Sequence, residues 1–223
     1  MWTSKVNFSD LCAKEKWKVE LFTNSKKESH SIYDMVPLKD IVQERKENFK
    51  PLSKPEESFN YIGLENIKSM TGELINFTPK LGKEIKSSTK KFYESDILYG
   101  KLRPYLNKVY LSERDAIEAG ICSSEFYVLI PDYSKVLPNY LRLILSSSYI
   151  QDYVNSMQTG STLPRININD LLNIKIPIPP INVQEDMERD IIKRKNRIKK
   201  ITKELDLLPK LTISEVEKVV KGI

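Results

Sequence analysis

Two stretches of the chain combine cations with glycine and proline in a way that suits contact with a phosphate backbone. ILYGKLRPYLNKVYL spans residues 97–111, and TGSTLPRININD spans residues 159–170. Lysine and arginine neutralise phosphates, hydroxyls and amides hydrogen-bond to DNA, and glycine allows a ligand to approach the main chain closely. These stretches predict DNA contact by Lys101, Arg103, Asn107, Lys108, Thr159, Gly160, Ser161 and Arg165.

The same stretches allow a plainer interpretation. A strand, a proline turn and a second strand would leave the cations of residues 97–111 exposed to solvent without a ligand. Arg165 suits a phosphate or, bidentately, a guanine, and it suits a structural salt bridge equally well. Tyr99 and Leu102 are expected in the core rather than at a ligand.

A second group of residues carries donors and acceptors that suit base edges in a DNA groove. Some lie in YIGLENI, at residues 61–67, and the others lie in the loop before Phe92. The residues assigned to this group are Tyr61, Glu65, Asn66, Lys83, Lys86 and Ser87. Each of them is equally compatible with a polar surface that binds nothing.

The sequence lacks the residue patterns of an enzyme. An adenine methyltransferase needs Asn or Asp directly before Pro-Pro to hold a flipped base, together with a glycine-rich cofactor turn, whereas here Ile178 precedes Pro179. Nuclease-like pairs such as Glu44 with Lys46 are expected by chance among 30 acidic and 36 basic residues. One histidine and two cysteines form no zinc cluster. We therefore predict a non-catalytic chain with no metal and no cofactor of its own.

The overall composition suits a polyanionic partner. The 223 residues carry a net charge of +6 and a pI near 9.1, although most of the 30% charged residues are expected to be solvated surface. Two cysteines are too few for a disulfide framework, which indicates a reducing compartment. No apolar run approaches the roughly 20 residues of a membrane span, and residues 1–10 lack the apolar core of a signal peptide. We expect a cytoplasmic protein that does not associate with membranes.

The pattern of elements predicts an α/β (α+β) fold, mixed and largely antiparallel, over residues 33–180. We predict short strands, rich in aromatic and β-branched residues, within 59–67, 109–111, 125–130 and 171–178. A helix is predicted from Pro138 to Met157, with a bend at Ser146 to Ser148, because its apolar residues recur at steps of three and four. Residues 1–32 are interpreted as an amino-terminal extension whose role stays open.

The last part of the chain, residues 181–223, is predicted to contain a long helix that pairs with a partner. Asn182 suits its N-cap, and Glu185 completes a reciprocal capping box. Steps of four and three give a heptad stripe of Met187, Ile191, Arg194, Ile198, Ile201, Leu205 and Leu208. If it ends at Pro209, the helix is about 39 Å long at about 1.5 Å per residue, and a short second helix follows at 214–220. The basic run KRKNRIKK at 193–200 is interpreted as charge beside the stripe rather than as a nucleic-acid site.

Five short motifs in series carry a family resemblance. They are GKLRP, CSSEF, TGS, PRIN and PPINVQE, and together they closely resemble the specificity subunits of type I restriction-modification systems. The resemblance runs from about Tyr33 to about Leu208 and corresponds to one target-recognition domain followed by one spacer helix. A complete subunit of this family carries two of each, so the chain corresponds to half of one.

This resemblance implies a non-catalytic subunit that reads a half-site in double-stranded DNA and docks methyltransferase (modification) subunits. S-adenosylmethionine would bind to those subunits, and ATP and Mg²⁺ to a separate restriction and motor subunit. A half-length subunit with an apolar stripe is expected to form a homodimer. Two alternatives stay open: the recognition domain of a single-chain restriction-methylation enzyme, and a coiled-coil scaffold that binds no DNA.

Overall fold

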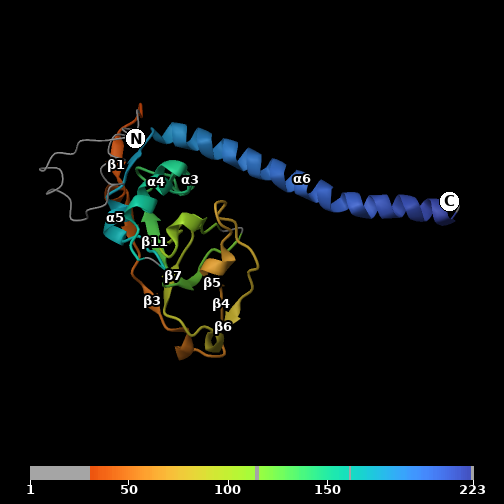
Figure 1. The fold of residues 1–223 in the computed structure, drawn as a ribbon, viewed down its shortest axis with the longest axis horizontal. Coiled ribbons are helices and arrows are strands. Elements are labelled where there is room, and N and C mark those ends of the chain that lie inside the picture. Colours follow the sequence, from red (N-terminus) through yellow and green to blue (C-terminus); the bar gives the residue numbers. More distant parts are fainter. Residues whose placement is uncertain (1–30, 114–115, 161, 222–223) are drawn as a thin grey trace, which may run out of the picture. The chain divides into compact units, whose positions relative to one another are not determined.

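The computed structural model describes residues 31–113, 116–160 and 162–221, and the chain divides into two units (Figure 1). The first unit ends at Pro179, and the second, which begins at Pro180, is a single helix. This division lies next to the predicted boundary between residues 180 and 181. The predicted extension, residues 1–32, lies almost entirely outside the described residues.

The first unit is built around a four-stranded antiparallel sheet in the order β2–β11–β8–β9. Its strands are β2 (Val42–Glu44), β11 (Phe126–Pro131), β8 (Ile97–Gly100) and β9 (Val109–Leu111). β11 is the predicted EFYVLI strand, and β8 pairs with β9 in a hairpin whose connection contains the GKLRP motif. The hairpin therefore places the predicted DNA-contacting cations at one end of the sheet.

Side chains along the central strands alternate between two hydrophobic clusters, as the period of two in a strand requires. Val128 is fully buried in one cluster, and its neighbour Leu129 is fully buried in the other. On β8, Leu98 lies opposite Val128 in the same cluster, while Tyr99 belongs to the other cluster, as predicted for a core residue. Leu102, also predicted in the core, is only half-buried. The sheet is covered on both faces, so packing fixes its position from two sides.

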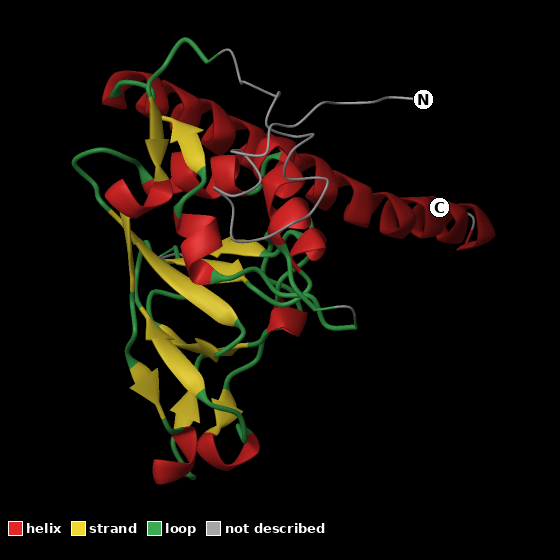
Figure 2. Ribbon diagram, turned by 60° about the vertical axis from the view of Figure 1, so that its left-hand side comes forward, coloured by secondary structure: helices red, strands yellow, loops and turns green. Residues whose placement is uncertain are grey.

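A second four-stranded sheet, in the order β3–β7–β10–β5, shares one of these clusters with the central sheet (Figure 2). Among the described strands, only the β10–β5 pair is parallel, so the fold is the mixed, largely antiparallel one predicted from the sequence. Two further pairs, β4–β6 and β1–β12, are antiparallel. The bounds of these strands are β3 (Asn48–Phe49), β7 (Thr89–Phe92), β10 (Gly120–Ser123), β5 (Tyr61–Ile62), β4 (Ser58–Phe59), β6 (Lys80–Leu81), β1 (Met35–Pro37) and β12 (Lys175–Pro177).

Helices α3 (Pro138–Leu145) and α4 (Ser148–Met157) pack on the other face of the central sheet. The sequence predicted one bent helix here, but the structure contains two. Ser147 separates them because its side chain accepts a hydrogen bond from the backbone N–H of Ile150 and so caps α4. Pro138 occupies the first turn of α3, as predicted.

The predicted strand at 171–178 is partly wrong. Its first two residues belong to a short helix, α5 (Ile168–Leu172), whose start is fixed by Asn167 accepting a hydrogen bond from the N–H of Asn169 at 2.8 Å. Only Lys175 to Pro177 form a strand, β12. Single-turn 3₁₀ helices connect other strands: η2 (Leu38–Asp40), η3 (Pro51–Ser53), η4 (Leu64–Asn66), η5 (Gly82–Glu84) and η6 (Pro104–Leu106).

The second unit contains α6 (Ile181–Lys221), which is longer than predicted. The helix begins before Asn182, because the carbonyl of Pro180 accepts the N–H groups of Val183 at 2.9 Å and of the next residue at 3.2 Å. Pro209 lies inside the helix, so the predicted end at this residue and the separate helix at 214–220 were wrong. Proline removes one hydrogen bond, and the turns before and after it keep their own. No helix in the described part of the chain is long and apolar enough to cross a membrane.

Candidate nucleic-acid interface

Two loops of the first unit, far apart in sequence, are joined by backbone hydrogen bonds. We call residues 101–108 the GKLRP loop and residues 159–166 the PRIN loop. The N–H of Arg103 donates to the carbonyl of Pro164 at 2.7 Å, and the N–H of Ile166 donates to the carbonyl of Lys101 at 3.2 Å. The two stretches that sequence analysis selected for their chemistry therefore form one continuous surface.

The backbone of these loops is held in conformations that most residues avoid. Arg103 and Asn107, which flank η6, both have left-handed backbones, with φ of 48° and 50°. Gly160 in the PRIN loop has a φ of 93°. A left-handed residue with a side chain costs about 1–2 kcal/mol and persists where its surroundings determine it. Here the hydrogen bond from the N–H of Arg103 to the carbonyl of Pro164 holds the backbone of Arg103 in this conformation.

Arg165 is the most firmly positioned cation of the surface. Its backbone exchanges two hydrogen bonds of 2.8 Å with Thr159, and its side chain forms a bidentate ion pair with Glu125. Nε lies 3.1 Å and Nη2 lies 2.9 Å from the two carboxylate oxygens, while Nη1 donates to the carbonyl of Leu163 at 3.2 Å. The hydrogen bond from Arg165 lowers the pKa of Glu125 below its usual range. The salt bridge considered for Arg165 from the sequence is thus present.

Lys101 lies at the edge of a group of charges around Tyr127. The Nζ atoms of Lys101 and Lys90 are 5.6 Å and 5.4 Å from the centre of the Tyr127 ring, within the range of cation–π attraction. The ring is fixed because its hydroxyl donates to the carbonyl of Ile166 at 3.0 Å. Lys90 also pairs with Glu44 at 3.2 Å. Of these two lysines, Lys101 is the one with no ion-pair partner among the described residues.

Arg103, like Lys101, has no ion-pair partner among the described residues. Its side chain is exposed and forms no hydrogen bond or ion pair with another residue in the described part of the chain. Thr159 and Gly160 are also exposed. Ser161, predicted beside them, lies outside the described residues.

Asn107 and Lys108 turn inward, and their positions argue against the predicted DNA contact. Asn107 is 5% exposed, and its Nδ2 donates to the carbonyl of Ser146 at 2.7 Å. The Nζ of Lys108 donates to the carbonyl of Leu64 at 2.6 Å, and desolvation lowers the pKa of this lysine. Both side chains hold the loop against its neighbours.

Two of the predicted base-contacting residues are also structural. Tyr61 is 9% exposed and belongs to a small cluster with Ile85 and Ile121. Asn66 is 6% exposed, accepts the N–H of Gly63 at 2.9 Å and donates to the carbonyl of Asn76 at 3.1 Å, which closes η4. Burial argues against base contact for both side chains.

The other candidates for base contact lie on the surface. Glu65 pairs with Lys80 at 3.8 Å, and Lys83 pairs with Glu56 at 3.0 Å. Lys86 and Ser87 are exposed and have no side-chain partner among the residues that the structure describes. The loop that carries them is tied to the CSSEF segment, because the N–H of Ser124 donates to the carbonyl of Ser88 at 3.2 Å. Lys86 and Ser87 thus stay available to a ligand.

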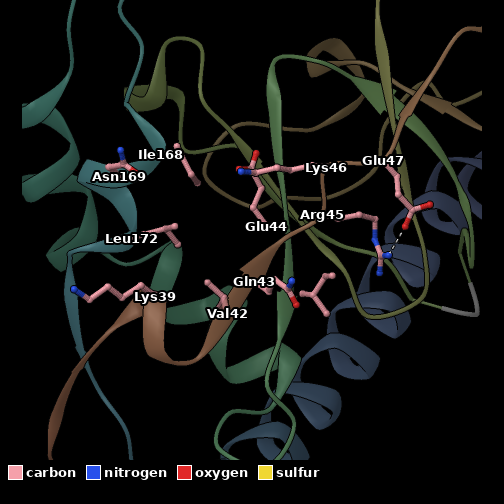
Figure 3. A pocket seen from close by; sticks show the side chains of 11 residues that line it. Lys39, Val42, Gln43, Glu44, Arg45, Lys46, Glu47, Ile168, Asn169 and Leu172 are labelled. Carbon is pink, nitrogen blue, oxygen red and sulfur yellow. Dashed lines mark hydrogen bonds and ion pairs between the residues drawn. The ribbon is translucent and has the colours of Figure 1, made fainter.

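A groove of about 670 Å³ lies between β2 and α5 (Figure 3). Val42 on β2 and Leu172 on α5 both line it. Two of its charged side chains pair, because Arg45 contacts Glu47 at 2.8 Å. The Nε of Arg45 also pairs with Asp96 at 2.8 Å, and this bond raises the pKa of Arg45. Within the described residues, no group of three or more His, Cys, Asp or Glu could hold a metal ion.

The heptad stripe of α6 is largely exposed to solvent. Ile198 is 62% and Leu205 is 58% exposed, and Met187, Ile201 and Leu208 are each more than two-fifths exposed. Arg194 is exposed as well, and Ile191 is half-buried. The predicted stripe therefore lies on one continuous helix, with apolar side chains on both sides of Arg194.

A family model described as the type I restriction modification DNA specificity domain matches residues 31–206. The chain belongs to this family. The type I restriction enzyme EcoDI specificity subunit of Escherichia coli is 30% identical over 131 residues, which cover 59% of this chain and 28% of that relative. The HsdS subunit from Thermoanaerobacter tengcongensis has a TM-score of 0.64 at 23% identity, covering 77% of this chain and 44% of that one.

A chain from a structural study of complex assembly and conformational transition of the type I restriction-modification system has a TM-score of 0.65 at 24% identity. That match covers 82% of this specificity-domain chain and 49% of the solved chain. The chain spans little more than a quarter of its curated relative and less than half of each solved relative. The solved relatives share its mixed domain and long helix.

Sequence reasoning missed Glu125, Lys90 and Tyr127 as parts of the surface. Glu125 was visible as the acidic residue of the quoted CSSEF motif, but its partner Arg165 lies 40 residues further along the chain. Lys90 and Tyr127 meet only because β7 and β11 belong to sheets that pack together. No local pattern indicates such a contact.

Proposed function

We propose that this chain is the sequence-specific DNA-recognition subunit of a type I restriction-modification system, which reads one half-site and docks methyltransferase subunits. Membership of a DNA specificity domain family supports this role. The structural observation that carries it is the joined surface of the GKLRP and PRIN loops, where the unpaired guanidinium of Arg103 lies on the same surface as Lys101 and Arg165.

The chemistry of this surface suits duplex DNA. Arg103 and Lys101 neutralise phosphates and release their counterions, which makes binding depend on salt. The hydroxyl of Thr159 and the open backbone at Gly160 supply uncharged contacts to the DNA backbone, which set the position of the protein along the duplex. Lys86 and Ser87, in the exposed loop after η5, are the remaining candidates for base edges.

Helix α6 supplies the assembly surface in this proposal. Its exposed apolar stripe docks methyltransferase subunits or the same helix of a second copy, because such a line of side chains is stabilised only when a partner covers it. A symmetric pair would read a palindromic or nearly palindromic target. The chain itself is non-catalytic: S-adenosylmethionine would bind to the methyltransferase subunits, and ATP and Mg²⁺ to a restriction and motor subunit.

The test combines binding and catalysis. The purified full chain is incubated with a randomised duplex DNA library, and the retained duplexes are sequenced. We expect a defined motif, no methyl transfer from labelled S-adenosylmethionine by the chain alone, and transfer when the methyltransferase subunit of the same restriction-modification system is added. Clear, dose-dependent transfer by the chain alone would contradict the subunit role, and retention without any motif would contradict sequence-specific recognition.

A charge-matched pair of variants shows whether the proposed surface is the binding surface. The first variant replaces Lys101, Arg103 and Arg165 by alanine. The control replaces Lys39, Lys46 and Lys175, three exposed lysines outside the two loops, by alanine. Both lose three positive charges, so a difference in affinity between them reports location rather than net charge. Equal loss in the two folded variants would reject the interface.

A further inference from the structure

Arg165 differs from Lys101 and Arg103, the other cations of the two loops proposed to contact DNA, because a carboxylate already balances its charge. Glu125 accepts two of its hydrogen bonds, and 41% of the Arg165 side chain remains exposed. A guanidinium paired with a carboxylate gains less from a phosphate than an unpaired one does, since repulsion by the carboxylate offsets part of the attraction. Such a pair keeps its directional N–H groups, which an uncharged acceptor can use.

The donors of Arg165 can be counted. A guanidinium has five N–H groups. Glu125 takes one from Nε and one from Nη2, and the carbonyl of Leu163 takes one from Nη1. One N–H remains on each terminal nitrogen. The two terminal nitrogens are bonded to the same carbon, and a donor from each is what a bidentate contact to O6 and N7 of guanine in the major groove requires.

We propose that Arg165 reads a guanine edge rather than a phosphate, and that Glu125 is the positioning residue that aims it. The inference rests on the proposed function, since it needs a DNA ligand on this surface. The positions of both residues are fixed by the fold: the carbonyl of Glu125 accepts the N–H of Lys101 at 2.9 Å, and the backbone of Arg165 is paired with Thr159. Arg103, with no partner, is the contrasting phosphate-type cation.

The experiment compares the motif and the salt dependence of five variants of the full chain with those of wild type on a randomised duplex library. Arg165→Ala and Glu125→Gln should both weaken the preference for G·C at the same position of the selected motif. Each variant should lose at least about fivefold in discrimination between G·C and the other base pairs there. Neither should reduce the salt slope, because no phosphate contact is lost. Arg103→Ala should instead leave the motif intact and reduce the slope by about one counterion.

Glu47→Gln is the matched control, because Glu47 also pairs with an arginine, Arg45, but in the groove beside β2. It removes the same charge and should leave the motif unchanged. If Glu125→Gln instead tightens binding to all sequences with an unchanged motif, Glu125 acts only through its charge and the inference is wrong. A reduced salt slope in Arg165→Ala would also overturn it, because that outcome marks a phosphate contact.

Folding is controlled with Arg165→Lys, which keeps the charge and loses the planar fork. It should lose the G·C preference while keeping the melting temperature within a few degrees of wild type. A wild-type chain that selects no motif would reject the proposed function together with this inference. If the wild-type chain selects a motif and both Arg165→Lys and Glu125→Gln select the same motif, the inference is rejected and the proposed function stands.

Discussion

The first unit and helix α6 treat large apolar side chains in opposite ways. In the central sheet of the first unit, Leu98 and Phe126 are completely buried between two layers. On α6, Ile198 and Leu205 are both more than half exposed. The first unit thus contains its own core, whereas the helix presents the kind of surface that a partner covers.

This difference separates stability from assembly. Burying apolar surface stabilises the first unit whatever else is bound. An isolated helix is marginal in water, and most helical stability in proteins comes from packing of its apolar face. The first unit is therefore expected to unfold as a cooperative unit of its own, and α6 to gain stability when it associates.

The largest effect is expected from Phe126→Ala, which removes a ring from the cluster between the two sheets. Replacing a buried phenylalanine typically costs about 3–5 kcal/mol, because the cavity left behind is only partly refilled. Urea denaturation followed by fluorescence should show this loss, while α6 association measured by sedimentation should weaken far less. Equal loss of both properties would show that the two units are not independent.

The next largest effect concerns the stripe. Replacing Ile198 and Leu205 by aspartate should weaken self-association by at least about a hundredfold, because two charges would enter an apolar seam. The control replaces Asn196 and Lys203, which have the same spacing on the opposite side of the heptad, by aspartate. Sedimentation at tens of micromolar compares them. A wild-type chain that is strictly monomeric would show that a different partner covers the stripe.

A smaller effect is expected from one exposed cation in the first unit. Arg103→Ala should lower DNA affinity by about three- to tenfold and make the salt slope shallower by about one, as expected for one lost phosphate contact. Lys46→Ala is the control, since Lys46 is also exposed and unpaired among the described residues but lies at the groove. Binding titrations at several salt concentrations measure both. Identical slopes would remove Arg103 from the interface.

The smallest expected effect is a pH dependence of the stability of the first unit. Pairing with Arg165 lowers the pKa of Glu125 in the folded state. A lowered folded pKa means that the stabilisation is present above the unfolded value of about 4.3 and is lost as pH falls through the folded value. The difference in melting temperature between wild type and Glu125→Gln should therefore shrink below about pH 4. A difference that stays constant down to pH 2 would mean that the pair does not contribute to stability.

The features that sequence analysis predicted correctly are those with a local period. Strand β11 was visible from its branched and aromatic residues, and the α6 stripe from its steps of three and four. The break between α3 and α4 was missed because Ser147 suits a bend as well as a new N-cap. Pro209 was taken as an end, but a long helix continues through one missing hydrogen bond.

The site was harder to predict because side-chain direction depends on the backbone around it. The left-handed residues Arg103 and Asn107 reverse the chain, so Lys108 points to the carbonyl of Leu64 while Arg103 points to solvent. From residue type alone, Arg103 and Lys108 were equally good candidates for DNA contact. The pairing of Glu125 with Arg165 depends on the meeting of two loops, which no spacing in the sequence encodes.

The pairing of β1 with β12 has a consequence for how this fold can be rearranged. Met35 lies opposite Pro177, so the recognition fold between β1 and β12 begins and ends on neighbouring antiparallel strands. A unit with adjacent ends can be inserted into another chain, repeated in tandem or circularly permuted without unthreading its core. A gene could gain, lose or exchange such a cassette as one block, and the hydrogen-bond register of both four-stranded sheets would stay the same.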